Sequence, residues 1–228
     1  MPEIIRVLVV DDSAYVRKVI RQMLSRSPFI DVVGAARDGK EALEMTAELQ
    51  PDVITCDLIM PELDGIGFIR EQMQRKPVST VVVSIASESG ELVLSALDAG
   101  AVDFVQKPTA LATDRLLEIA DDLIERVKAA AGARPMVAQA ATAAAPSRIV
   151  ATNAFDVVVI GISTGGPQAL KALIPKLPSG FPVPIAIVLH MPVGYTELYA
   201  RKLDEQSQLT VVEARGSKLA AIVMEPVR

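Results

Sequence analysis

Short runs of β-branched and aliphatic residues alternate with helical patterns over residues 1–125. Between these runs, apolar residues recur at helical spacing, as in the set Val16, Val19, Ile20, Met23 and Leu24. Strands that alternate with helices are typical of a parallel sheet with helices on both faces. We therefore predict a five-stranded doubly wound parallel α/β domain with strands at Ile5–Val10, Ile30–Ala35, Val53–Cys56, Thr80–Ser84 and Asp103–Gln106.

An alanine-rich segment interrupts the pattern of hydrophobic positions. About half of the residues from 129 to 154 are alanine, none is acidic, and two prolines lie among them. This composition predicts an interdomain linker over residues 126–154, between a first domain at 1–125 and a second at 155–228. In an alternative interpretation, the alanines extend the preceding helix as far as Gly132, where a helix stop is available.

A second, shorter α/β pattern follows the linker. A strand at Phe155–Ile160 leads into a glycine-rich turn, and the elements after it are a helix at Pro167–Leu173, a strand at Pro184–Leu189, a helix at Thr196–Leu203 and a strand at Leu209–Ala214. Two helices cannot cover both faces of such a parallel sheet. We therefore expect an incomplete parallel α/β domain with exposed apolar surface.

Composition and charge narrow the function. The 228 residues carry a formal net charge of −5 and only 4% aromatic residues, which argues against nucleic acid as a partner. The single cysteine, Cys56, and the single histidine, His190, exclude a disulfide framework and a Cys/His zinc cluster. No apolar run approaches the roughly 20 residues that span a bilayer, and the N-terminus lacks a signal-peptide pattern. We expect a cytoplasmic protein with no membrane insertion.

Acidic side chains follow two of the predicted strands, and a hydroxyl and an ammonium follow two others. Asp11 and Asp12 end the first strand, Asp57 the third, Ser84 the fourth and Lys107 the fifth. Because the carboxyl ends of parallel strands meet at one edge of a sheet, these groups should converge. Clustered carboxylates repel one another, and Mg²⁺ suits an all-oxygen site without histidine or thiol. The arrangement supports phosphoryl transfer to a carboxylate, with Asp57 as the best acceptor.

Each of these residues also has a structural interpretation. Asp12 and Ser13 form a helix N-cap pattern, Asp57 suits a strand-end turn, and Lys107 suits a charged surface. The structural interpretation is preferred for any one residue alone. The coincidence of all of them at successive strand ends favours a site.

The motifs of the first domain resemble those of the receiver domain of two-component response regulators. They are Asp11-Asp12-Ser13, the run from Asp57 through Ile59 to Gly65, Ser84, and Phe104-Val105-Gln106-Lys107-Pro108. The resemblance implies that Asp57 is the phosphoacceptor and a sensor histidine kinase of chemotaxis the phosphodonor. It implies that Mg²⁺ is bound by Asp11, Asp12, Asp57 and the Ile59 carbonyl. It also implies that Ser84 and Phe104 form a switch pair and that Lys107 binds the phosphate.

A serine and the only histidine occupy corresponding places in the second domain. Ser163 lies in the turn Gly161-Ile162-Ser163-Thr164-Gly165-Gly166-Pro167, between a strand and a helix, and His190 ends the neighbouring strand. Free N–H groups at a helix start stabilise an oxyanion, and a Ser/His pair is the minimum machinery for acyl transfer. The glycine spacing argues against a dinucleotide or phosphate loop. The residues alone leave a hydrolase and a purely structural turn equally open.

This turn, together with the run His190-Met191-Pro192-Val193-Gly194-Tyr195-Thr196, resembles the catalytic domain of chemotaxis protein-glutamate methylesterases, in which a receiver precedes a serine esterase. The resemblance implies hydrolysis of glutamate methyl esters, and deamidation of glutamines, on the cytoplasmic helices of methyl-accepting chemoreceptors, without a cofactor for the esterase. It implies Ser163 as nucleophile, His190 as general base, and Thr164, Gly165 and Gly166 as the active-site turn. Phosphorylation of Asp57 would move the receiver off the esterase cleft.

The sequence departs from this family near its end. The family pattern is lost after about residue 215, and the aspartate that completes the family's catalytic triad is expected to be absent from this sequence. Loss of the orienting aspartate costs about 10⁴ in rate in serine-protease templates. Two hypotheses therefore stand. One is a phosphorylation-controlled methylesterase, and the other is a phospho-switch or binding protein whose truncated esterase domain is inactive.

Overall fold

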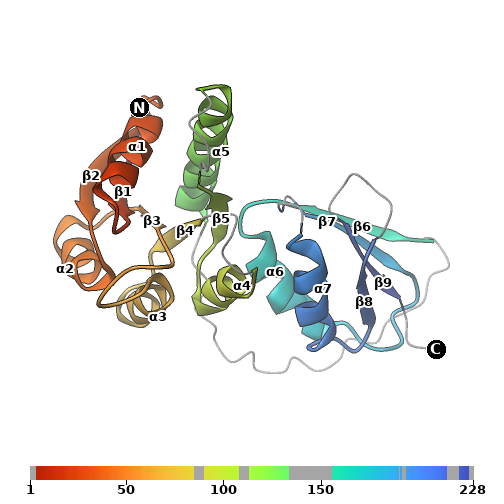
Figure 1. Ribbon diagram of the computed structural model, residues 1–228. Coiled ribbons are helices and arrows are strands. Elements are labelled where there is room, and N and C mark those ends of the chain that lie inside the picture. Colours follow the sequence, from red (N-terminus) through yellow and green to blue (C-terminus); the bar gives the residue numbers. More distant parts are fainter. Residues whose placement is uncertain are drawn as a thin grey trace. The chain divides into compact units, whose positions relative to one another are not determined.

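The computed structural model describes residues 4–84, 90–107, 113–133, 156–189, 191, 194–214 and 221–225, with the backbone alone for 113–118 and 221–225. The chain divides into two units, Met1–Val137 and Ala138–Arg228 (Figure 1). In the described part of the chain, no helix is both long and apolar enough to cross a membrane.

The first unit is built on a five-stranded parallel sheet. Its strands are β1 (Ile5–Val10), β2 (Ile30–Ala36), β3 (Val53–Cys56), β4 (Ser79–Ser84) and β5 (Asp103–Gln106), in the order β2-β1-β3-β4-β5. β3 and β4 are buried along their whole length, as expected for central parallel strands covered on both faces. The predicted doubly wound sheet is confirmed, with strand limits that agree to within one residue.

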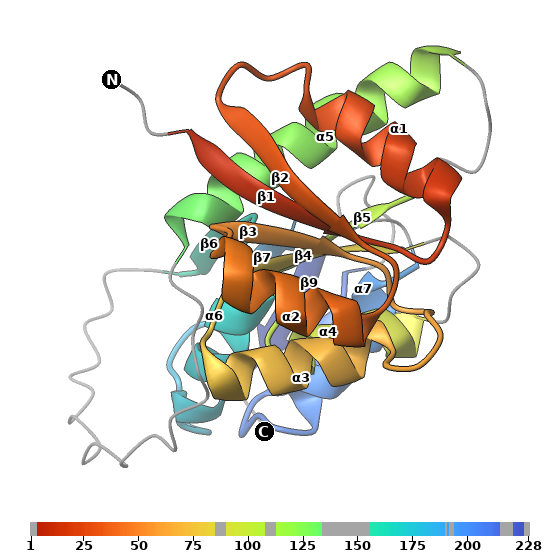
Figure 2. The same ribbon diagram turned by 90° about the vertical axis from the view of Figure 1, so that its left-hand side faces the viewer.

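Five helices cover the two faces of this sheet. They are α1 (Ala14–Leu24), α2 (Gly39–Leu49), α3 (Gly65–Arg75), α4 (Gly90–Ala99) and α5 (Thr113–Gly132). Figures 1 and 2 show α1 and α5 together on one face and α2, α3 and α4 on the other. Helix α5 ends at Gly132, so it continues into the range predicted as linker, as in the alternative interpretation of the alanines. The remaining linker residues up to 154 lie outside the described part of the chain, and the domain limits stay a prediction.

The second unit contains a smaller, mixed sheet. Its elements are β6 (Val158–Ile162), α6 (Gly166–Leu173), a short 3₁₀ helix (Ile174–Lys176), β7 (Ile185–Leu189), α7 (Thr196–Asp204), β8 (Thr210–Glu213) and β9 (Ala221–Glu225). The strand order is β6-β7-β9-β8. The pairing of β6 with β7 is parallel, as predicted, but β9 is antiparallel to both of its neighbours.

Strand β9 was not predicted from the sequence. It lies after residue 215, where the family pattern was expected to be lost, and it inserts between β7 and β8. Only residues 214–220 separate β8 from β9. A parallel crossover needs a dozen or more residues, so this short connection returns the chain antiparallel to β8.

One face of this second sheet keeps apolar residues in solvent. The side chains of Val159 and Val212 are 66% and 48% exposed, whereas Ile185 and Ile187 are buried. The register pairs Val159 with Ala186, Ala186 with Val223 and Val223 with Val212, so the exposed valines belong to one row across the sheet. Exposed apolar surface was expected here, because two helices cannot cover both faces.

Candidate functional site

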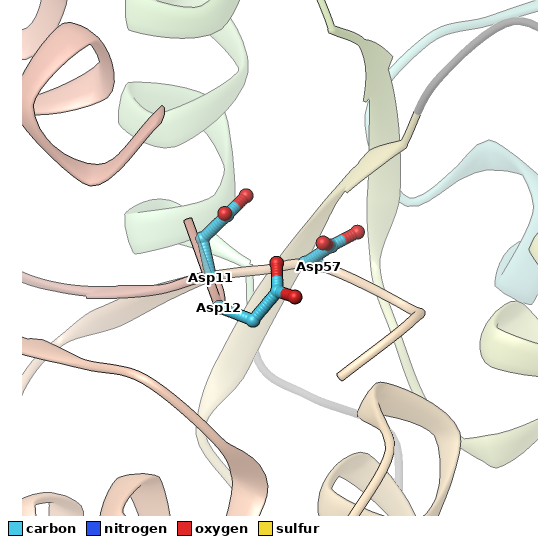
Figure 3. Close-up of side chains that lie close together, drawn as sticks. All are labelled: Asp11, Asp12 and Asp57. Atoms are coloured by element: carbon cyan, nitrogen blue, oxygen red, sulfur yellow. The ribbon is translucent and has the colours of Figure 1, made fainter. Parts of the chain in front are cut away.

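Three carboxylates meet where the order of the first sheet reverses. β1 and β3 are adjacent strands of this sheet. The helices that follow them, α1 and α3, cover opposite faces of the sheet, so a crevice opens at the carboxyl ends of the two strands. Asp11 and Asp12 follow β1 and Asp57 follows β3, and one oxygen from each lies within 4.8 Å of the others (Figure 3). The convergence expected from the strand ends is therefore present for these three residues.

Backbone hydrogen bonds fix two of the three carboxylates. The Asp57 N–H donates to the Val10 carbonyl at 2.9 Å, and the Leu58 N–H donates to Asp57 Oδ1 at 2.7 Å. The Ser13 N–H donates to Asp11 Oδ1 at 2.9 Å. Asp11 and Asp57 are buried, whereas Asp12 is exposed. The cluster is thus rigid on its inner side and open to solvent at Asp12.

Lys107 supplies one positive charge to two buried carboxylates. Its Nζ atom lies 2.6 Å from Asp57 Oδ2 and 2.8 Å from Asp11 Oδ2, and its side chain is only 9% exposed. The Lys107 N–H donates to the Ser84 carbonyl at 2.6 Å, which holds the residue after β5 against the end of β4. One ammonium between two carboxylates leaves the site with an uncompensated negative charge.

This charge imbalance and the burial perturb the titration of both partners. Burial raises the pKa of Asp57, the neighbouring Asp11 adds to that rise, and Lys107 opposes it without cancelling it. Burial acts to lower the pKa of Lys107, but its hydrogen bonds and Coulombic attraction to Asp11 and Asp57 outweigh burial and raise it. Lys107 therefore stays charged, while ionised Asp57 is held in an unfavourable environment.

The donor set fits a hard divalent cation. Three carboxylates offer oxygen ligands within one small volume, and Asp12 is exposed on the side from which an ion and its waters would approach. Among the described residues, Asp11 Oδ2 makes no hydrogen bond beyond its contact with Lys107. A cation at this point would neutralise the excess negative charge.

The loop from Leu58 to Asp64 is anchored at both ends by contacts that the sequence analysis did not single out. The Gly65 N–H donates to the Leu58 carbonyl at 3.0 Å, and Asp64 Oδ1 accepts from the Gly67 N–H at 2.7 Å, capping α3. A Cβ atom on Gly65 would lie 2.0 Å from the Asp57 carbonyl oxygen. Glycine is required at 65 for this close approach, and the Asp-Gly pair before a helical pattern is the sequence signal for it.

The predicted switch residues lie on two neighbouring strands, β4 and β5, and Lys107 directly follows β5. Ser84 ends β4 and Phe104 lies within β5, with Ser84 opposite Gln106 in the register. Both side chains are buried. Ile59, expected to ligate through its carbonyl, lies two residues after Asp57 and has an exposed side chain. Their proposed roles in switching and ligation stay predictions.

Ser163 occupies the strand-to-helix turn that the sequence indicates. It directly follows β6, and its side chain is exposed. Its carbonyl accepts from the Gly166 N–H at 2.8 Å. Gly165 has φ +76°, a left-handed conformation that favours glycine. A Cβ on Gly166 would press against Ile162 at 3.0 Å, so the turn packs closely onto β6.

The end of the neighbouring strand lies at the same edge of the sheet. Ile162 of β6 pairs with Leu189 of β7 in parallel register, so the chain leaves both strands side by side. His190 itself lies outside the described residues, and its pairing with Ser163 stays a prediction. Two acids of this unit are engaged elsewhere. Asp204 Oδ1 accepts from the Val211 N–H at 2.8 Å, and Glu213 accepts a hydrogen bond from the Thr196 hydroxyl.

Comparisons with protein families match both units. The response regulator receiver domain family matches residues 7–121, and the CheB methylesterase family matches residues 158–222. The first match contains the acidic cluster, and the second contains Ser163 and the segment with His190. The order of the two matches agrees with the order of domains expected from the motifs.

Two relatives carry similar sequences along most of this chain. The protein-glutamate methylesterase/protein-glutamine glutaminase 5 of Myxococcus xanthus is 52% identical over 217 residues, which cover 92% of this chain and 62% of the relative. A protein of the same description, without the number, from Symbiobacterium thermophilum is 45% identical over 229 residues, covering 93% of this chain and 63% of the relative. The chain thus spans less than two thirds of the length of these relatives.

A solved structure resembles the first unit. The response regulator domain of Thermotoga maritima CheB superposes with a TM-score of 0.54 at 41% sequence identity, and the match covers 58% of this chain and all of that domain. The sheet order and the acidic cluster described above therefore belong to a known type of domain.

Proposed function

The chain belongs to the response regulator receiver family and continues into a methylesterase segment, and we propose that it is a chemotaxis response regulator whose phosphorylation controls an esterase. The proposed reactions are hydrolysis of glutamate methyl esters and deamidation of glutamines on the cytoplasmic helices of chemoreceptors. The descriptions of both relatives favour this function over a binding protein with an inactive second domain. The proposed compartment is the cytoplasm, where these helices lie.

The first proposed step is phosphoryl transfer to Asp57. A carboxylate oxygen of Asp57 attacks the phosphorus of a phosphohistidine on a sensor kinase, the N–P bond breaks, and the imidazole leaves. Lys107 Nζ, 2.6 Å from Asp57 Oδ2, neutralises charge on the transferred group. Mg²⁺ held by Asp11, Asp12, Asp57 and the Ile59 carbonyl would supply further positive charge. The Ser84 hydroxyl then binds a phosphate oxygen, and Phe104 changes position with it.

The second proposed step is acyl transfer through Ser163. Its Oγ atom attacks the ester carbonyl while His190 removes the hydroxyl proton, and that proton leaves with methanol. Water, deprotonated by His190, then attacks the acyl-serine carbonyl, the bond to Ser163 Oγ breaks, and His190 returns the proton to Oγ as the glutamate side chain leaves. With a glutamine substrate, ammonia leaves in place of methanol. The turn from Thr164 to Gly166, at the start of α6, is the proposed source of N–H donors to the oxyanion.

One observation supports each half of the proposal. For phosphorylation it is the Lys107 ammonium shared by the buried carboxylates of Asp11 and Asp57, which leaves a negative charge that a cation would compensate. For ester hydrolysis it is the exposed Ser163 in a tightly packed strand-to-helix turn, beside the strand that leads to His190.

Phosphorylation is tested with a small phosphodonor and Mg²⁺. The protein should acquire an acid-stable, base-labile acyl phosphate, because an aspartyl phosphate has this stability profile. Asp57→Asn should abolish labelling, and Asp31→Asn, an exposed aspartate on β2, should retain it. Labelling that persists in Asp57→Asn would show that the acceptor is another residue.

Ester hydrolysis is tested by methanol release from membranes that contain methylated chemoreceptors. Ser163→Ala should abolish release, while Ser179→Ala, an exposed serine of the same unit, should leave it unchanged. Equal release by wild type and Ser163→Ala would exclude Ser163 as the nucleophile. Normal phosphorylation without any Ser163-dependent methanol would favour the phospho-switch or binding protein.

A further inference from the structure

One hydrogen bond joins the helix that follows the predicted histidine to the helix that follows the serine. The Tyr199 hydroxyl, on α7, donates to the Pro167 carbonyl, at the start of α6, over 2.8 Å. Tyr199 is only 5% exposed, so this bond is made away from solvent. A buried hydroxyl that loses its partner carries a desolvation cost, which ties the two helices to each other at this point.

The accepting carbonyl belongs to the same compact turn as Ser163. The Ser163 carbonyl accepts from the Gly166 N–H, and the Gly165 carbonyl accepts from the Ala169 N–H at 3.0 Å. These hydrogen bonds join the serine turn to the first turn of α6. Gly166 already rests on Ile162 of β6. Tyr199 therefore gives the serine turn a second contact, from α7 rather than from the sheet.

The other end of the connection leads toward His190. α7 begins at Thr196, and its first residue is bonded to Glu213 at the end of β8. The chain between β7 and α7 is short, because Leu189 and Thr196 are separated only by residues 190–195. Tyr199 thus links the serine turn to the helix that follows the segment containing His190.

We propose that Tyr199 is a positioning residue that fixes the Ser163 turn against α7 through its hydrogen bond to Pro167. This inference rests on the proposed esterase function. In this proposal Tyr199 acts through the Pro167 carbonyl and not on the substrate. Its loss should reduce the fraction of time in which serine and histidine are aligned, because small misplacements of reacting groups reduce rates steeply.

The test compares Tyr199→Phe with Asp204→Ala in the full-length protein. Tyr199→Phe keeps the ring and removes only the hydroxyl. Asp204→Ala also deletes a hydrogen bond of α7, to Val211, but at the far end of the helix from the serine turn. For Tyr199→Phe we expect kcat for methyl ester hydrolysis, per fluorophosphonate-titrated Ser163, to fall about tenfold with KM within twofold of wild type. For Asp204→Ala we expect kcat per titrated serine to stay within twofold.

A purely structural role for Tyr199 predicts a different result. Both variants would then lose stability without a change of kcat per titrated serine, and a kcat for Tyr199→Phe within twofold of wild type would overturn the proposal. Hydrogen exchange distinguishes failure of the positioning role of Tyr199 from failure of the proposed esterase function. If wild type has no Ser163-dependent activity, the Gly166 and Ala169 amides should still exchange about tenfold faster in Tyr199→Phe than in Asp204→Ala. Equal exchange in the two variants would overturn the proposal in that case.

Discussion

Two buried carboxylates that share a single ammonium define the chemistry of the acidic cluster at the scale of the residue. Asp11 and Asp57 both contact Lys107 Nζ, and the Asp57 pKa is raised because burial outweighs this partner. A group whose pKa is raised on folding contributes stability at low pH and loses that contribution as the pH rises through the folded value. Ionised Asp57 therefore costs stability at neutral pH, until a cation compensates it.

We expect Asp57→Asn to stabilise the metal-free protein at pH 7, by about 1 kcal/mol, because it removes the uncompensated charge and leaves Lys107 paired with Asp11. Urea denaturation in the presence of a chelator measures this difference. The difference should shrink as the pH is lowered through the raised Asp57 pKa, where the wild-type carboxyl becomes neutral. Saturating Mg²⁺ should stabilise wild type more than the variant. A less stable Asp57→Asn in chelator at pH 7 would contradict this account.

Lys107→Met should have the opposite effect. It leaves two buried carboxylates without a cation. Breaking a buried ion pair in this way should lower the free energy of unfolding by up to about 3 kcal/mol, because Asp12 opens the site to solvent. Adding Asp57→Asn to Lys107→Met should recover part of the loss. Lys128→Met is the control, since its ion pair with Glu125 lies at the surface and should matter far less. Equal denaturation midpoints for Lys107→Met and Lys128→Met would show that the cluster is not electrostatically coupled.

The residues of the cluster were predictable because strand ends of a parallel sheet converge. Asp11, Asp12, Asp57 and Lys107 are each the first or second residue after a strand, so their proximity follows from topology alone. Gly65 was named only as the end of a motif, and Tyr199 was not singled out, since the close approach of Gly65 to Asp57 and the bond from Tyr199 to Pro167 are through-space contacts. The contact of Lys107 with two carboxylates likewise could not be predicted, because it depends on the folded site.

At the scale of the element, the β3–α3 loop depends on one glycine. The Cβ of an alanine at 65 would lie 2.0 Å from the Asp57 carbonyl, so the backbone must shift at the residue that carries the proposed phosphoryl group. Gly65→Ala should lower both stability and Mg²⁺ affinity, the latter by about tenfold. Gly132→Ala, at the open end of α5, is the matched control and should lower neither, since alanine fits a helix there. Calorimetric Mg²⁺ titration checks the affinities, and equal values for the two variants would contradict this role of Gly65.

Helix α5 is joined to β5 by a buried ion pair. Arg126 Nη1 lies 2.7 Å from Asp103 Oδ1, with both side chains almost fully buried, and Asp103 Oδ2 has no hydrogen bond within the described residues. Arg126→Met should lower the free energy of unfolding by about 3 kcal/mol, because it leaves the buried Asp103 carboxylate without a cation. The double variant with Asp103→Leu should cost less than Arg126→Met alone. A double-mutant cycle by urea denaturation measures this coupling, and strictly additive effects would contradict it.

The elements of the two sheets were predictable to different degrees. β1, β3 and β5 have the predicted limits, because each is a short run rich in β-branched or aromatic residues between helical patterns. β9 was missed, since the family pattern was expected to end at about residue 215 and the second sheet was expected to be parallel. The methylesterase family in fact matches as far as residue 222. The short spacing between β8 and β9 was the available signal, as it excludes a parallel crossover.

At the scale of the whole molecule, the proposed phosphorylation site and the proposed hydrolytic site lie in separate units of one chain. The acidic cluster and the Ser163 turn each occupy the carboxyl edge of their own sheet, where strand-to-helix loops present polar groups. The central claim is that phosphorylation of Asp57 controls chemistry at Ser163.

The most direct measurement is methanol release from methylated chemoreceptor membranes, with and without a small phosphodonor and Mg²⁺, by the wild type and two variants. We predict that the phosphodonor increases the rate for wild type, that Asp57→Asn retains only the unstimulated rate, and that Ser163→Ala releases no methanol under either condition. Stimulation that persists in Asp57→Asn, or release that persists in Ser163→Ala, would contradict the account.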